Sequence, residues 1–247
     1  MVKGLYTAYS GLTVQQKRLD VVSNNLANAT TTGYKKEGLT TQSFKDVYGI
    51  KVKDETVGYI NQNIGTLNLG AKIGESFRSW DQGSFQNTGN TFDFALSGSG
   101  LFSISFTNKA GETSTLYTRD GSFQMNREGY LVTKDGDFVL GENGPIQLPT
   151  DFEKLTVEES GEIYALVDFE NYDYVEAYGE NLYRAVDGAT QTDATATVNQ
   201  GYLEASNINV VTEMVDMISI ARDFESNQKI MNTIDEMLGK MVSISEI

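Results

Sequence analysis

Residues 207–244 read NINVVTEMVDMISIARDFESNQKIMNTIDEMLGKMVSI. Apolar side chains recur here at every seventh residue, and a second apolar series follows three places after the first, so both series fall on one face of a helix. The first series is Val210, Met217, Phe224, Met231 and Leu238, and the second is Ile220, Ile234 and Met241. The spacing predicts a helix over 207–244 with Asn207 or Asn209 as its N-cap.

The N-terminus repeats this pattern. Leucines stand at every seventh position, and smaller apolar residues follow three of them at the same spacing of three. The two series are Leu5, Leu12, Leu19 and Leu26, then Ala8, Val22 and Ala29. We predict a helix over 3–29, and Asn25, Asn28 and Gly33 can supply the left-handed conformation that ends a helix.

The middle of the chain is predicted to be β-structure. Short runs of alternating apolar residues are separated by turn signals that contain glycine, the pattern of strands joined by tight turns. The predicted strands are 92–96, 101–106, 116–118, 129–133, 138–140, 155–157 and 163–167. The predicted turns are 108–111, 120–121, 135–136 and 160–161.

These patterns predict a mainly β fold class, in which a discontinuous β body is inserted between N- and C-terminal α-helices that pair as a coiled-coil layer. Residues 1–34 with 207–247 form a terminal helical assembly domain, 35–84 with 185–206 an extended connector, and 85–184 an all-β body.

The narrow apolar stripes need partners, because short heptad helices alone are marginally stable in water. Either the two helices of one chain form a hairpin that caps the β body, or several chains form a coiled-coil layer on assembly. Polar seam residues favour the second arrangement, since they select register and partner: Gln15, Asn227 and Gln228. The predicted assembly interface is Leu5, Leu12, Leu19, Val22, Leu26, Val210, Met217, Ile220, Phe224, Met231, Ile234, Leu238 and Met241.

The composition argues against catalysis. The chain has no cysteine and no histidine. Thiolate nucleophiles, disulfides and Cys-ligated metals are therefore excluded, and the commonest general base and transition-metal ligand is missing. We expect no enzyme activity, no cofactor and no metal site.

The net charge of −15 is unevenly distributed. Residues 1–60 carry eight Lys/Arg against five Asp/Glu, whereas the remainder carries 11 against 29. An acidic body without a basic stripe disfavours nucleic acid as a partner. No run reaches the roughly 18 apolar residues that span a bilayer. The N-terminal apolar run meets Gln15–Arg18 too early for a cleaved signal peptide, so we expect neither a lipid-spanning segment nor such a signal.

Several local motifs predict structure only. Gly98–Gly100 lacks the third glycine of a dinucleotide loop, and Asp135–Asp137 lacks the later ligands of a calcium loop, so both predict turns. The adjacent Glu158 and Glu159 indicate a solvated surface. A set of aromatic residues favours core and interface packing over a carbohydrate platform: Trp80, Tyr164, Tyr172, Tyr174, Tyr178 and Tyr183.

Segments along nearly the whole chain resemble the flagellar rod and hook proteins, in that family's order. The N-terminal signature is matched by Tyr9–Leu12, Ser23–Asn28 and Thr30–Lys35. The β domain and the approach to the C-terminal helix are matched by Phe94–Phe102, Tyr117–Phe123, Asn181–Arg184 and Gln200–Asn207. The family-motif residues carried over are Asn24, Asn25, Asn28 and Gly33.

The resemblance implies a structural subunit of the bacterial flagellar basal-body rod. Its terminal helices would pack into a tube around the export channel, with β domains outside. The implied partners are further copies in a helical homopolymer, the other axial proteins of rod and hook, and the flagellar type III export apparatus. The implied location is the basal body, reached by export beyond the cytoplasmic membrane without a cleaved signal.

The resemblance leaves the particular subunit open. Gln15–Asp20 favours the distal rod protein, whereas Ile220–Phe224 favours its proximal paralogue. The length of 247 residues favours either over the usually longer hook protein. The alternatives are a hook-type axial protein and a secreted β-rich adhesin or interaction module.

Overall fold

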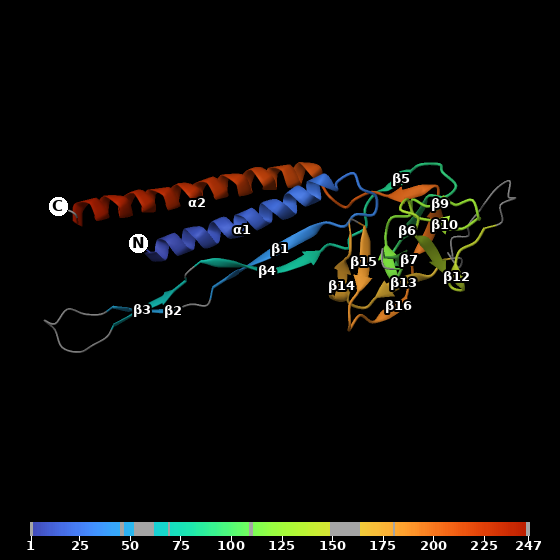
Figure 1. The fold of residues 1–247 in the computed structure, drawn as a ribbon, viewed down its shortest axis with the longest axis horizontal. Coiled ribbons are helices and arrows are strands. Elements are labelled where there is room, and N and C mark those ends of the chain that lie inside the picture. Colours follow the sequence, from blue (N-terminus) through green and yellow to red (C-terminus); the bar gives the residue numbers. More distant parts are fainter. Residues whose placement is uncertain are drawn as a thin grey trace. The chain divides into compact units, whose positions relative to one another are not determined.

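The structure is a computed structural model that describes residues 2–44, 47–51, 62–68, 70–108, 111–148, 164–179 and 181–245. The chain forms two compact units (Figure 1). The helix–hairpin unit consists of Met1–Leu26, Glu37–Arg78 and Val210–Ile247. The β unit consists of Ala27–Lys36 and Ser79–Asn209. Each terminal helix thus shares a unit with a segment from the predicted connector.

Helices α1 (Val2–Ala27) and α2 (Val210–Ser245) confirm the two predicted terminal helices. Glu213 lies in the first turn of α2, where the partial positive charge of the helix N-terminus favours a carboxylate. Asn207 was one of two candidates for the N-cap, but its side chain binds elsewhere. Its Oδ1 accepts from the backbone N–H of Lys36 at 2.7 Å, and its Nδ2 donates to the Ser79 carbonyl at 2.9 Å. Within the described residues, neither helix carries an apolar stretch long enough to cross a membrane.

Two antiparallel strand pairs follow α1 in the helix–hairpin unit. Strand β1 (Glu37–Ser43) pairs with β4 (Ala71–Arg78), and β2 (Val47–Lys51) pairs with β3 (Gln62–Leu67). The β1–β4 ladder runs from Glu37 opposite Arg78 to Ser43 opposite Ala71, with an irregularity between Leu39 and Thr41. The outer half of β1 is exposed on both faces, and only its first half is partly buried.

Among the described residues, ten strands form the main antiparallel sheet of the β unit, with the path β14-β15-β8-β7-β11-β10-β9. Strand β13 pairs with β7 and β16, and β12 pairs with β11. Their bounds are β7 Leu101–Thr107, β8 Thr113–Thr118, β9 Gln124–Met125, β10 Leu131–Val132, β11 Phe138–Gly141, β12 Gly144–Pro145, β13 Leu166–Phe169, β14 Val175–Ala177, β15 Leu182–Ala185 and β16 Gln191–Asp193. A short 3₁₀-helix, η1 (Tyr172–Tyr174), precedes β14.

Two further strand pairs bring the end of the β unit back to its beginning. Strand β17 (Thr197–Gln200) pairs with β6 (Phe94–Ser97), and β18 (Tyr202–Glu204) pairs with β5 (Phe85–Asn87). The Thr- and Asn-rich composition of residues 185–206 predicts an extended connector. The structure pairs three strands of this segment with the rest of the unit, because a strand in which polar residues alternate with a few small apolar ones still completes a ladder.

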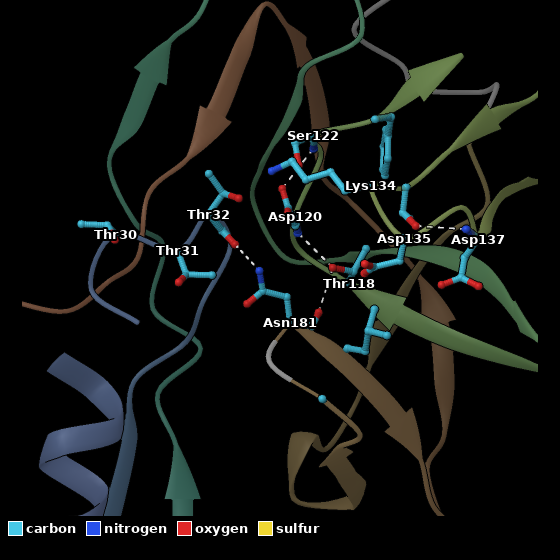
Figure 2. Close-up of a pocket in the computed structure, with 14 residues that line it drawn as sticks. Thr30, Thr31, Thr32, Thr118, Asp120, Ser122, Lys134, Asp135, Asp137 and Asn181 are labelled. Carbon is cyan, nitrogen blue, oxygen red and sulfur yellow. Dashed lines mark hydrogen bonds between the residues drawn. The ribbon is translucent and has the colours of Figure 1, made fainter. Parts of the chain in front are cut away.

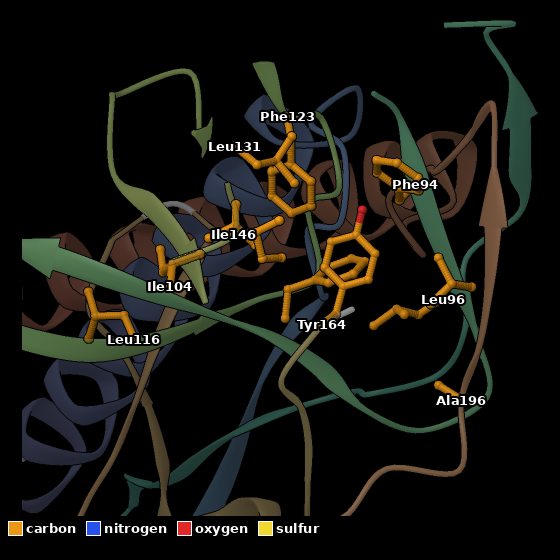
Figure 3. Packing of buried hydrophobic residues seen from close by; sticks show 12 residues of the cluster. Phe94, Leu96, Ile104, Leu116, Phe123, Leu131, Ile146, Tyr164 and Ala196 are labelled. Atoms are coloured by element: carbon orange, nitrogen blue, oxygen red, sulfur yellow. The ribbon is translucent and has the colours of Figure 1, made fainter. Parts of the chain in front are cut away.

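Strand β7 is buried on both of its faces. Phe102 and Ile104 point into the main core cluster, whereas Leu101 belongs to a second cluster, as alternation along a strand requires. Figure 3 shows the main cluster, with the Tyr164 ring among its aliphatic and aromatic neighbours. In the second cluster, the Trp80 ring lies 4.5 Å from that of Tyr172. Trp80 therefore packs against aromatic side chains, as predicted.

The predicted β body is confirmed at most of its strands and turns. In the 108–111 turn, the N–H of Gly111 donates to the Asn108 carbonyl at 3.0 Å, and in the 135–136 turn Gly136 has φ +95°. The predicted strand 155–157, the turn 160–161, and Glu158 and Glu159 lie outside the described residues.

Candidate assembly site

The two terminal helices pair antiparallel within one chain, and Figure 1 shows them side by side. The two helices approach closely at the glycines of α1. A Cβ added to Gly4 would lie 3.6 Å from Ile234 Cδ1, and a Cβ added to Gly11 would lie 3.0 Å from Asn227 Nδ2. Farther along, Gln15 Nε2 donates to Asp223 Oδ2 at 3.3 Å. Each step forward along α1 is matched by an equal step backward along α2. The pairing is therefore continuous and keeps one register.

Most of the predicted heptad residues are shielded from solvent, and Ile234 is one of the residues at this helix pair. Leu12, Ile220 and Ile234 are buried, and Ile220 is only 2% exposed. The half-buried members are Leu5, Leu19, Val22, Leu26, Met217, Phe224, Met231 and Leu238. Val210 and Met241 lie near the ends of α2 and are exposed. Eleven of the thirteen predicted interface residues are thus buried or half-buried within the chain.

An apolar surface outside both heptad series was missed from the sequence. We call it the α2 patch: Val211, Met214, Val215 and Ile218, which are 71%, 46%, 60% and 55% exposed. These positions are spaced by three and four residues, so they share one face of the first turns of α2. The signal was present in the sequence, because those turns are apolar on more than the one stripe that a helix pair can cover.

Asn25, one of the family-motif residues, joins three elements of the helix–hairpin unit. Its Nδ2 donates to the Glu37 carbonyl at 2.8 Å and to Glu213 Oε2 at 3.2 Å, and its Oδ1 accepts from the Glu37 N–H at 3.0 Å. Asn25 thereby ties the end of α1 to the start of β1 and to the first turn of α2. Asn24 is exposed beside it.

The prediction that Asn25 or Asn28 ends α1 in a left-handed conformation is wrong. No non-glycine residue in the described ranges has a positive φ. Asn28 instead closes a turn, because its carbonyl accepts from the Thr31 N–H at 3.2 Å. The Asn25 side chain instead donates hydrogen bonds to Glu37 and Glu213, and the spacing of residues in the sequence does not reveal these contacts.

Gly33 does adopt the left-handed region, with φ +69°. Its N–H donates to the Glu204 carbonyl at 2.8 Å. A Cβ at this position would lie 2.6 Å from the Arg119 carbonyl carbon and from the Asp120 nitrogen, well inside van der Waals contact. Two independent constraints, the backbone angle and the close approach of another backbone, therefore require glycine here.

We expect Gly33→Ala to destabilise the β unit far more than Gly89→Ala. Gly89 has the same φ of +69° and nothing within 4 Å of its Cβ position. The angle alone costs about 1–2 kcal/mol, and forcing backbone atoms apart adds about 1–3 kcal/mol at Gly33 only. Urea unfolding of the two variants measures the difference, and equal losses would show that crowding at Gly33 contributes nothing.

A buried ion cluster occupies the β unit where motif segments converge. Lys35, Glu204 and Arg119 are 2%, 1% and 5% exposed at their side chains. Lys35 Nζ lies 2.8 Å from Glu204 Oε1, and Arg119 Nε lies 2.6 Å from Glu204 Oε2. One carboxylate thus bridges two cations, and each of its oxygens accepts a charge-assisted hydrogen bond.

Backbone groups satisfy the rest of the cluster. Lys35 Nζ also donates to the Asp81 carbonyl at 2.7 Å, and the Gly83 N–H donates to Glu204 Oε1 at 2.9 Å. The Arg119 guanidinium donates to the Leu96 carbonyl in β6 and to the Gly98 and Gly100 carbonyls in the loop between β6 and β7. The cluster therefore fastens the segment that follows α1 to the segment that precedes α2, within the β unit.

Electrostatics favour the charged carboxylate. Burial by itself raises the pKa of Glu204, but the adjacent Arg119 and Lys35 outweigh this effect and hold the pKa below its ordinary value. Burial lowers the pKa of Lys35, although Glu204 opposes that shift. None of these three residues was singled out from the sequence, although each is a charged member of a quoted motif segment.

A polar pocket of about 570 Å³ lies in the β unit, lined by Thr30–Thr32, Thr118, Asp120, Asp135 and Asp137, among others (Figure 2). Asp120 Oδ1 accepts a hydrogen bond from the Ser122 N–H at 3.0 Å. Burial raises the pKa of Asp137, and the charge of the neighbouring Asp135 raises it further. Across the described part of the chain, no three His, Cys, Asp or Glu residues are grouped to hold a metal ion.

Three protein-family models match the chain. Residues 5–35 match the flagella basal body rod protein family, 95–165 the D1 domain of the flagellar hook protein FlgE/F/G, and 199–244 the C-terminal region of the flagellar basal body rod FlgEFG proteins. Lys35, Arg119 and Glu204 each fall in a different one of these segments. The architecture and the motif residues therefore define a flagellar axial protein.

Full-length relatives narrow the class. The chain is 34% identical to the flagellar basal-body rod protein FlgG of Bacillus subtilis (strain 168), over 99% of both chains. It is 32% identical to FlgG of Agrobacterium fabrum, over 96% of this chain and 97% of the relative. It is also 32% identical to FlgF of Caulobacter vibrioides, over 96% and 95%. The chain belongs to the flagellar basal-body rod protein family and is a structural rod subunit of the flagellum.

Proposed function

We propose that the chain polymerises through its helix–hairpin unit into a helical rod around an export channel. The α2 patch is the observation that carries this proposal. Its four apolar side chains remain exposed after α1 has covered the heptad seam. An exposed apolar surface of this kind on a folded protein marks a site of association.

The distribution of charge also favours the helix–hairpin unit as the part of the molecule through which subunits contact one another. The helix–hairpin unit carries 11 Lys/Arg against 13 Asp/Glu, whereas the β unit carries eight against 21. Copies of a nearly neutral unit can approach closely, while strongly acidic units repel one another. We therefore assign subunit contacts to the helix–hairpin unit, with the heptad residues forming its inner seam, and place the β unit on the outside of the rod.

The remaining parts of the proposal follow from membership of the family. The subunit is a non-enzymatic structural component, consistent with relatives that are all described as rod proteins. Its partners are further copies of itself, the other axial proteins of rod and hook, and the flagellar export apparatus. It reaches the basal body by export without a cleaved signal peptide.

We expect Ile218→Asp to abolish polymerisation of the full chain. A carboxylate on the α2 patch would have to be desolvated at the subunit contact, which costs several kcal/mol, whereas it stays hydrated in the monomer. The matched control is Ser219→Asp, one residue along α2 and also exposed, but about 100° around the helix from Ile218 at the edge of the patch. Sedimentation and electron microscopy of the polymer measure the effect. A wild-type chain that remains monomeric at all concentrations and in the presence of rod seeds would contradict the proposed function.

A further inference from the structure

Asn143 and Gly144 form the single Asn-Gly pair in the sequence of this chain. They lie at the turn between β11 and β12, where Gly141 is opposite Gly144. The Asn143 side chain is exposed, and Gly144 has a φ of +111°. The pair therefore lies at the surface of the β unit, in a backbone conformation that glycine adopts more readily than other residues.

The two residues have the chemistry for attack of the backbone on a side chain. The amide carbon of an asparagine side chain lies within reach of the backbone nitrogen of the following residue, and closure between the two gives a five-membered ring. A side chain on the following residue obstructs this approach, above all a stiff β-branched one. Gly144 has no side chain, so its nitrogen can approach Asn143 Cγ without obstruction.

The hairpin around the pair is weakly held. Its ladder joins Gly141 to Gly144 and Leu140 to Pro145, and Pro145 has no N–H to donate. The first buried residue after the turn is Ile146. Hairpin ends with little buried surface open at a low cost in free energy. Gly144 can therefore leave its place in the ladder while the core cluster stays intact.

We propose that Asn143 is a site of spontaneous deamidation in the folded chain. The Gly144 nitrogen forms a bond to Asn143 Cγ, its proton passes to the departing amide nitrogen, and ammonia leaves. Solvent water then opens the resulting succinimide. Addition of water at Cγ breaks the new bond and gives aspartate, whereas addition at the backbone carbonyl breaks the original peptide bond and gives isoaspartate.

Both products change the turn. Each adds a negative charge beside Glu142, in a β unit that already carries eight Lys/Arg against 21 Asp/Glu. Isoaspartate also lengthens the backbone between β11 and β12 by one methylene group, which disturbs the register that the turn sets. Ile146 belongs to the main core cluster and lies two residues after Gly144, so the altered turn adjoins the core.

Incubation of the full chain at pH 8 tests the proposal. The products are located by peptide mapping with mass spectrometry, and isoaspartyl methyltransferase labels the isoaspartate. Asn90 is the internal control, since it is also exposed and outside the strands but precedes the β-branched Thr91. We expect Asn143 to be modified at least about tenfold faster than Asn90, which corresponds to a barrier about 1.4 kcal/mol lower. Asn143→Gln should give at most a trace of product there, because glutamine would have to close a larger ring.

The same chain unfolded in guanidinium chloride separates the chemistry of the pair from the effect of the fold. Asn143 should react before Asn90 there too, because Gly144 follows it in either state. If the unfolded chain modifies Asn143 first and the folded chain modifies it no faster than Asn90, the hairpin protects the pair and the proposal is overturned. Polymerisation takes no part in this experiment, so its result is independent of the proposed function.

Discussion

Ile220→Asp is expected to separate α1 from α2 and to eliminate polymer from the full chain. Ile220 is the least exposed apolar residue of the seam, at 2%. A carboxylate there would lose the apolar contacts of the isoleucine and would have to be desolvated, and burying a charge costs several kcal/mol. Such a loss exceeds what the remaining heptad contacts can compensate, because helices of this length have little stability of their own.

The measurement is amide hydrogen exchange on the monomer, followed by sedimentation after assembly. Protection should collapse across α1 and α2 and persist in the β unit, which has its own core clusters. Ser219→Asp serves as the control, since Ser219 is exposed on the neighbouring helical face. Ile220→Asp chains that keep helix protection and assemble with normal yield would show that the seam does not hold the unit together.

Glu204→Ala should destabilise the β unit by about 3–5 kcal/mol, the cost of leaving buried charges without a partner. The substitution leaves Lys35 and Arg119 almost fully buried without the carboxylate that bridges them. It also removes the acceptor for the Gly83 N–H. Glu176→Ala is the matched control, because Glu176 pairs with Arg184 at 3.6 Å on the surface and its loss should cost less than about 0.5 kcal/mol.

The pH dependence of stability provides a separate signature of the same cluster. The pKa of Glu204 is held below its ordinary value of 4.5 in the folded chain. Its contribution is therefore fully present above that ordinary value and is lost as the pH falls through the lower, folded-state pKa. Urea midpoints measured from pH 7 to pH 3 should fall for the wild type, and less steeply for Glu204→Ala. Parallel profiles would indicate that the carboxylate contributes no linked stability.

The local features of this protein were readable from the sequence. Both terminal helices follow from apolar residues at heptad spacing, since the faces of a helix depend only on positions three and four apart. The turn around Gly136 followed from an Asp-Gly pair between alternating strands, which is also a local signal. The assignment of the chain to the rod family depended on its motif segments, and the three matching protein-family models confirm this assignment.

The connections between distant segments were decided only by the tertiary structure. No local pattern predicts that Lys35, Arg119 and Glu204 share one buried site, because the burial of these charges depends on contacts between residues that are 85 and 169 positions apart in the sequence. Asn25 was misread as a helix terminator for the same reason, since its partners Glu37 and Glu213 become visible only in the folded unit. The sequence alone determined which helical faces are apolar. Which of those faces the partner helix covers, and which it leaves exposed as the α2 patch, depended on the antiparallel register, because a helix pair buries one stripe of each helix and no more.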